Sequence, residues 1–73
     1  MKTAVWTDAF HGVSHLKPVK QGFQVTITDH GVFVYAFVAS HDRFTPMYSD
    51  YFPTIASAKT WAETVSKRIG LVE

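Results

Sequence analysis

The sequence contains no cysteine, and this absence excludes several kinds of chemistry. Disulfides, thiolate nucleophiles and cysteine-ligated zinc all require a cysteine sulfur. Small secreted domains commonly depend on disulfides, so we expect an intracellular, cytoplasmic protein. The N-terminal residues show no apolar signal-peptide region, and no apolar run approaches the ~18 residues of a membrane span. We therefore expect no association with a membrane.

An excess of one charge is also missing. Seven basic and six acidic residues give a formal net charge of +1. Nucleic-acid-binding domains usually carry a basic patch, because neutralising phosphates supplies much of their affinity. The net charge therefore favours a protein partner over nucleic acid.

What the chain does contain is apolar and aromatic material. Hydrophobic residues make up 47% of its 73 residues and aromatic residues 15%. This composition is sufficient for a single folded domain over residues 1–73 without cross-links. A domain of this size has little room for both a core and a deep substrate pocket.

The clearest strand pattern covers residues 23–28, where apolar and polar side chains alternate with the period of a half-buried strand. Asp29, His30 and Gly31 follow and have turn chemistry, since glycine tolerates positive φ and aspartate bonds to the backbone ahead of it. Residues 32–39 are a second apolar segment of strand length. The pattern predicts a β-hairpin.

The hairpin would have two different faces. A two-residue turn at residues 30–31 would place Ile27 opposite Val34 and Val25 opposite Ala36, on an aliphatic face that suits a packed helix. The other face would carry an aromatic row beside polar side chains. These are Phe33, Tyr35 and Phe37 with Gln24, Thr26 and Thr28.

Three further segments have weaker patterns. Residues 3–10 predict a short strand, since they contain residues that favour strands. Residues 12–22 predict a loop, because they contain two glycines and a proline. Residues 43–52 predict an extended segment, in which Pro46 restricts any strand to a sheet edge or interrupts it.

Thr54 is a suitable N-cap, and the residues after it have the spacing of a helix. Apolar residues then recur at intervals of three and four: Ile55, Ala58, Trp61, Ala62, Val65 and Ile69. Ser66 falls away from this stripe, and Gly70 suits the C′ position at which helices end. We predict an α+β fold, with a small antiparallel sheet of three to four strands and this C-terminal helix packed on one face.

No combination of residues predicts catalysis. The carboxylates and serines fall in turns, on the helix surface or at termini, and there is no glycine-rich phosphate loop. On a helix, His11 and His15 would have metal-ligand spacing, with Asp8 as a third ligand. However, the residues between the histidines are poor helix formers, and a fourth ligand is lacking. We therefore predict no enzymatic activity, no metal site and no cofactor.

The aromatic row is the strongest candidate for a functional surface. Aromatic residues are enriched in protein interfaces, and on a sheet they can also stack nucleic-acid bases. Alternatively, residues 12–22, the N-terminal segment or a second copy of the chain covers the row. Tyr48 and Tyr51 would extend the surface if they are exposed. The predicted partner-binding residues are Gln24, Thr26, Phe33, Tyr35, Phe37, Tyr48 and Tyr51.

The segment Tyr-Phe-Pro-Thr at residues 51–54, followed by Ala58, Trp61 and Ala62, resembles two groups of small sheet-plus-helix proteins. One group is the phage-encoded inhibitors and regulators of host RNA polymerase. The other is the AP2-like and integrase arm-binding DNA modules. The first resemblance implies a regulator without an active site. The second implies a sheet face that contacts DNA. However, AP2-like modules place Arg, Lys and Trp on that face, and the predicted face of this chain has no basic residue.

These observations predict a small non-enzymatic interaction protein of the kind that phages encode. It would bind and modulate a larger host protein complex, such as RNA polymerase or a defence system. The alternative is a nucleic-acid-binding module that uses the aromatic sheet face. A homodimer joined through the same face is a third possibility.

Overall fold

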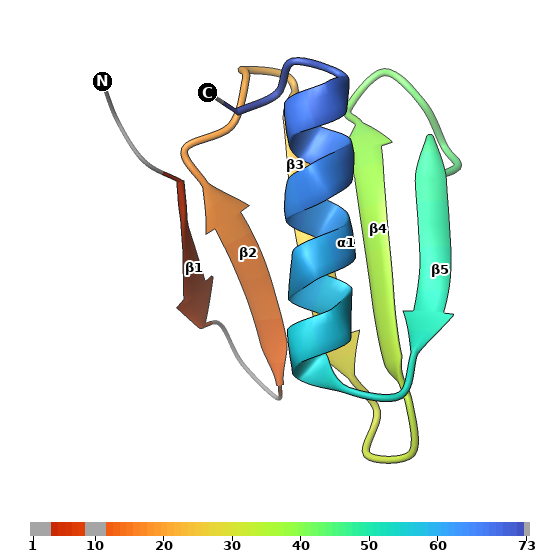
Figure 1. The fold of residues 1–73 in the computed structure, drawn as a ribbon. Coiled ribbons are helices and arrows are strands. Elements are labelled where there is room, and N and C mark those ends of the chain that lie inside the picture. The colour runs from red at the N-terminus through yellow and green to blue at the C-terminus, as the bar shows by residue number, and fades with distance from the viewer. Residues whose placement is uncertain (1–3, 9–11, 73) are drawn as a thin grey trace.

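The computed structural model describes residues 4–8 and 12–72. Its elements, in chain order, are β1 (Val5–Asp8), β2 (Val13–Lys17), β3 (Phe23–Asp29), β4 (Val34–Ser40), β5 (Tyr48–Phe52) and α1 (Ile55–Arg68). Figure 1 shows α1 lying in front of a single sheet, with all the strands behind it. One face of the sheet therefore carries the helix.

The strands follow one another across the sheet in chain order, β1-β2-β3-β4-β5, and each is antiparallel to the next. This confirms the predicted α+β fold with a C-terminal helix on an antiparallel sheet. The predicted number of three to four strands was too low, because the sheet has five. The predicted loop at residues 12–22 contains β2, with Gly12 and Pro18 just outside its two ends.

The β3–β4 hairpin exists, but its register differs from the predicted one. Ile27 pairs with Ala36 and Val25 with Val38, which is a shift of two residues from the expected partners. The connection is residues 30–33, because the His30 N–H donates to the Phe33 carbonyl at 2.9 Å. A shift of two residues keeps every side chain on the same face, whereas a shift of one would have exchanged the faces.

Local turn chemistry within this connection is as predicted. Gly31 has a φ of 90°, a conformation that glycine adopts readily and other residues rarely adopt. The Asp29 side chain accepts a hydrogen bond of 2.8 Å from the Gly31 N–H. The composition of the segment therefore identified the turn, but it did not determine its length.

Both ends of α1 are capped as the sequence predicted. Thr54 is the N-cap, and its Oγ1 accepts a 3.1 Å hydrogen bond from the Ser57 N–H. At the other end, Gly70 has a φ of 81° and donates to the Lys67 carbonyl, while the Leu71 N–H donates to the Ser66 carbonyl at 2.8 Å. These two bonds form a Schellman motif, which ends the helix and returns Leu71 to the core.

The core lies between α1 and the sheet in two adjoining groups of buried side chains. The first group is Leu16, Val25, Val38, Ala62 and Leu71. The second is Ile27, Val34, Ala36 and Ala58. Trp61 is only half-buried and packs beside the second group, with its ring centroid 5.5 Å from that of Phe52.

A ridge of small residues brings the helix close to the sheet. Ala58, Ala62 and Ser66 are each 0% exposed and lie four residues apart along α1. The expectation that Ser66 falls away from the core was wrong, because it continues the spacing of the two alanines. Its Oγ is buried and has no hydrogen-bond partner in the part of the chain that the structure describes.

Among the described residues, no helix is both long enough and apolar enough to cross a membrane. The helix α1 contacts β3, β4 and β5 on one face of the sheet, and no described helix lies on the opposite face of these strands. We call this the open face; it is the far side of the sheet in Figure 1.

Candidate interaction face

The strand register determines which side chains lie on the open face. Successive residues of a strand point to opposite sides, and directly paired residues share a side. Val25 is buried under α1, so its neighbour Thr26 lies on the open face with its partners His15 and Phe37. The strand residues on this face are Val5, Thr7, Val13, His15, Lys17, Gln24, Thr26, Thr28, Tyr35, Phe37, Ala39, Ser49 and Tyr51.

Four aromatic rings are in continuous contact at one side of the open face. The Tyr51 ring lies 5.2 Å from Phe33 and 5.0 Å from Tyr35, and Tyr35 lies 5.7 Å from Phe37. These separations fall within the range preferred by interacting aromatic pairs. We call Phe33, Tyr35, Phe37 and Tyr51 the aromatic cluster. Tyr51 is 64% exposed and Phe33 39%, so the cluster offers a large apolar surface to a partner.

The central strands contribute a polar group beside the cluster. The Thr26 Oγ1 lies 3.0 Å from His15 Nδ1 and accepts a longer bond of 3.4 Å from Gln24 Nε2. Thr26 itself is only 3% exposed, because its neighbours cover its short side chain. Of the two polar residues predicted for the surface, Gln24 can therefore meet a partner directly, and Thr26 instead positions Gln24 and His15.

The open face carries little charge. The three described strand carboxylates, Asp8, Asp29 and Asp50, pair with residues on the helix side. Within the described strands, the open face thus has no carboxylate, and Lys17 is its only lysine or arginine. Depletion of charged residues together with enrichment in aromatic residues is typical of the cores of protein interfaces.

Tyr48 lies on the other side of the sheet from the aromatic cluster. It pairs with Val38, which is 0% exposed beneath α1, so its side chain is on the helix side. The structure therefore does not bring Tyr48 together with Tyr35 and Tyr51. The reason is geometric: Tyr48 and Tyr51 are three residues apart on one strand, and an odd separation places two side chains on opposite faces. At 47% exposure, Tyr48 belongs to a different surface.

Two of the three residues considered as metal ligands, Asp8 and His15, are not brought together in the described structure. Asp8 and His15 lie on opposite faces of the sheet, because Asp8 pairs with Ser14 and His15 pairs with Thr7. His11 lies outside the described residues. Within residues 4–8 and 12–72, no group of three or more potential ligands is close enough to hold a metal ion.

No family model, curated protein or solved structure matches this chain. The residues and their geometry therefore carry the functional argument.

Four open-face residues, Val5, Thr7, Ala39 and Ser49, were not predicted on this face from the sequence. Three more lie on β2, namely Val13, His15 and Lys17. They alternate with Ser14 and Leu16, which point toward the helix and are 8% and 2% exposed. This period-two pattern is present in the sequence. The glycines and proline around it favoured a loop, and Leu16 is the only large aliphatic residue on the inner side to reveal the strand.

Proposed function

We propose that this chain is a small interaction protein without catalytic activity, which binds and modulates a larger host protein through the open face. The aromatic cluster carries the proposal. A single exposed apolar residue on a protein surface is ordinary, but four rings in contact on one face form a patch of the kind that marks interaction sites.

The dimensions of the face suit a protein interface. Five strands spaced about 4.8 Å apart give a surface roughly 20 Å across. A standard interface buries about 800 Å² on each partner, which is roughly a sixth of the 5086 Å² surface of this chain. The aromatic cluster would supply the buried anchors, and Gln24, His15 and Ser49 would supply hydrogen bonds around them.

The proposed partner is a host protein complex such as RNA polymerase or a component of a defence system. The small size and simple architecture of the chain, on which its resemblance to phage-encoded regulators rests, support this choice. So does the lack of a catalytic constellation, since a protein of this kind acts by occupying a surface of its target.

A pull-down from nuclease-treated bacterial lysate, read by mass spectrometry, tests the proposal. We expect the wild-type chain to recover one protein complex in stoichiometric amount and Tyr51→Ala to lose it. Ile55→Ala is the matched control, because it removes an exposed apolar side chain at the start of α1, outside the strands of the open face. Recovery of no stoichiometric protein, or equal recovery by Tyr51→Ala, would overturn the proposal.

A second candidate uses the same face to stack the bases of single-stranded nucleic acid. The absence of carboxylates from the described strands of the open face favours it, because carboxylates would repel phosphates. In a direct titration, an oligonucleotide that binds and is lost with Tyr51→Ala would support this candidate. A homodimer through the aromatic cluster would instead appear as self-association in sedimentation, which Tyr51→Ala would abolish.

A further inference from the structure

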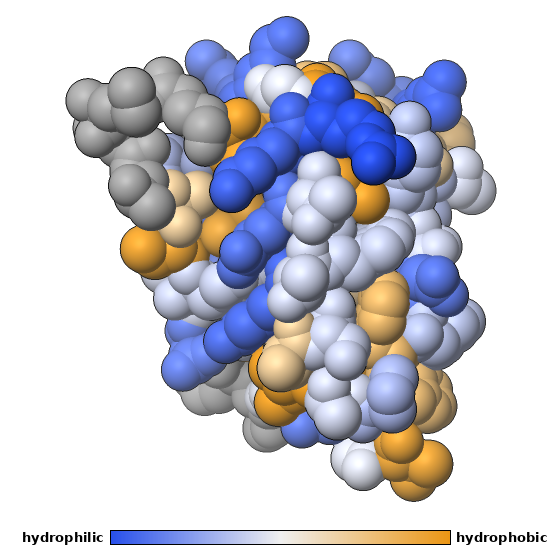
Figure 2. Space-filling model, viewed as in Figure 1, coloured by the Kyte–Doolittle hydropathy of each residue, from blue (hydrophilic) through white to orange (hydrophobic). Residues whose placement is uncertain are grey.

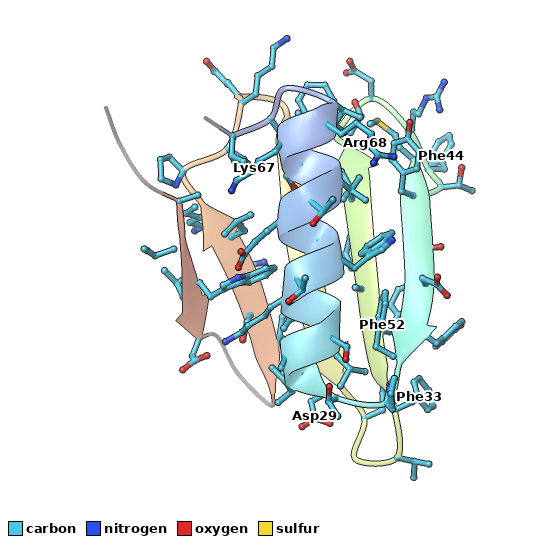
Figure 3. All side chains as sticks on the ribbon, viewed as in Figure 1. Asp29, Phe33, Phe44, Phe52, Lys67 and Arg68 are labelled. Carbon is cyan, nitrogen blue, oxygen red and sulfur yellow. The ribbon has the colours of Figure 1, made fainter. Side chains whose placement is uncertain are left out.

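Three segments that are distant in the sequence meet at one end of the molecule. The connection between β2 and β3 and the loop between β4 and β5 lie side by side, because the His41 N–H donates to the Gly22 carbonyl at 2.9 Å. The end of α1 joins them, because the Lys20 N–H donates to the Leu71 carbonyl at 2.9 Å. Figure 3 shows Lys67, Arg68 and Phe44 at this same end.

Most of the described lysines and arginines lie at this end. Five exposed cations lie there: Lys17, Lys20, Arg43, Lys67 and Arg68. We call this surface the basic end; in Figure 2 it is strongly hydrophilic where α1 finishes. The remaining described lysine or arginine is Lys59, near the start of α1.

The carboxylates are distributed in the opposite way. Of the five described carboxylates, only Asp42 lies in a segment of the basic end. The others are Asp8, Asp29, Asp50 and Glu63, in the middle or at the far end of the sheet and helix. Among the described residues, the basic end therefore has an excess of positive charge and the rest has an excess of negative charge, although the formal net charge of the chain is only +1.

Stabilisation of α1 explains only part of this clustering of cations. Lys67 and Arg68 lie in the last turn of α1, where they interact favourably with the helix dipole. Lys17, Lys20 and Arg43 lie in a strand and two connections, so the dipole gives no reason for them. Lys20 and Arg43 place positive charge on the connections between strands at this end, and Lys17 extends it onto the open face.

Two exposed rings accompany these cations. Phe44 follows Arg43 in the β4–β5 loop and is fully exposed, at 109% of the reference area. Tyr48 begins β5 directly after that loop and is 47% exposed. Cations that neutralise phosphates, together with rings that stack on unpaired bases, are the two components by which proteins bind single-stranded nucleic acid.

We propose that the basic end binds single-stranded nucleic acid, with its five cations on the phosphates and Phe44 stacked on a base. An anionic membrane fits less well, because interfacial membrane binding requires a broad apolar face, and the exposed large hydrophobic residues in this region of the described structure are only Phe44, Tyr48 and Val5, the last beside Lys17. The basic end contains no residue of the aromatic cluster and shares only Lys17 with the open face, so this proposal does not depend on the proposed function.

A fluorescence-anisotropy titration with labelled oligothymidylate of about 20 nucleotides tests the proposal. If all five cations contact phosphates, the logarithm of the binding constant should fall with the logarithm of salt concentration with a slope of about −3.5. The measurement runs from about 50 to 200 mM salt. No binding at the lowest salt concentration would overturn the proposal.

Charge-reversal variants locate the site. Arg43→Glu should weaken binding by at least about fivefold near 0.1 M salt and make the salt slope shallower. Lys59→Glu is the matched control, since it changes the net charge equally but lies roughly 12 Å along the helix axis from Lys67. That separation exceeds the Debye length of about 10 Å, so binding should be almost unchanged. Equal losses in both variants would overturn the assignment to the basic end.

Phe44→Ala separates stacking from charge. It should weaken binding by about fivefold to a hundredfold while leaving the salt slope unchanged. Unchanged affinity would remove Phe44 from the site. Vesicles containing phosphatidylserine provide the remaining arm: binding to vesicles without binding to the oligonucleotide would overturn the proposal in favour of a membrane surface. Circular dichroism of each variant checks that the fold is retained.

Discussion

The two faces of the sheet are built from alternate residues of the same strands, yet they differ in a way that stability alone does not explain. On β4, Val34, Ala36 and Val38 lie under α1 at 3%, 0% and 0% exposure. Tyr35 and Phe37, between them, lie on the open face. Large rings bury the most apolar area, so a sequence selected only for a stable core would place them under the helix. Their position on the open face supports a role in binding.

The helix-covered face depends on close fit. Ala58 and Ala62 of α1 lie over a sheet surface that includes Ala36 and Val38, and all four are fully buried. Small side chains allow the helix to approach closely, so changes in volume here are strongly felt. The open face has no such partner within the described residues, and its side chains should tolerate substitution without loss of the fold.

The largest effect is expected for Leu16→Ala. Leu16 is 2% exposed and packs with Val25, Val38 and Ala62, so truncation leaves a cavity in the core. The free energy of unfolding should fall by about 3 kcal/mol, measured by urea denaturation. That is a large share of the stability of a small domain, so much of the variant could be unfolded at 37 °C. Lys17→Ala, the exposed neighbour on the open face, should change it by less than about 0.5 kcal/mol.

A smaller loss of stability is expected when either of two adjacent rings of β5, which point to opposite faces, is truncated to alanine. Phe52 is half-buried against Trp61, so Phe52→Ala should lower the free energy of unfolding by about 2 kcal/mol, less than for a fully buried ring. Tyr51 is 64% exposed, and Tyr51→Ala should lower it by less than about 1 kcal/mol. If Tyr51→Ala proved the more destabilising, the aromatic cluster would be a structural feature, and its role in binding would lose its main support.

The sequence predicts these faces better than it predicts the pairing that creates them. The turn at Asp29 and Gly31 was identified from local chemistry, but its length depends on how the whole hairpin closes, so the register was displaced by two residues. The aliphatic and aromatic faces survived because the displacement was even. Tyr48 was misplaced for a different reason: it lies three residues from Tyr51 on one strand, so the two side chains point to opposite faces.

The helix was predictable in more detail, because its determinants are local. Thr54 and Gly70 cap it through bonds to residues no more than four positions away. The basic end was not predictable in the same way. Lys20, Arg43 and Lys67 are far apart in the sequence, and only an antiparallel sheet of five strands followed by a helix brings them to one end. A net charge for the whole chain cannot reveal such a distribution.

The smallest effect is expected for Ser66→Ala, and its sign is informative. Ser66 is 0% exposed, and its Oγ has no hydrogen-bond partner among the described residues. A buried hydroxyl without a partner is unfavourable, and alanine is the better helix former. The free energy of unfolding should therefore rise by about 0.5–1 kcal/mol, measured by urea or thermal denaturation.

The control for Ser66→Ala is Thr64→Ala. This variant removes an exposed hydroxyl, which donates to the Thr60 carbonyl. It therefore measures the effect of helix propensity at the protein surface. A greater gain for Ser66→Ala would show that the hydroxyl is unsatisfied beneath the helix. A loss of stability would mean that the hydroxyl makes a bond. If Ser66→Ala gives the greater gain, then small size is what matters at Ala58, Ala62 and Ser66. Close packing then defines the helix-covered face, whereas exposed rings define the open face.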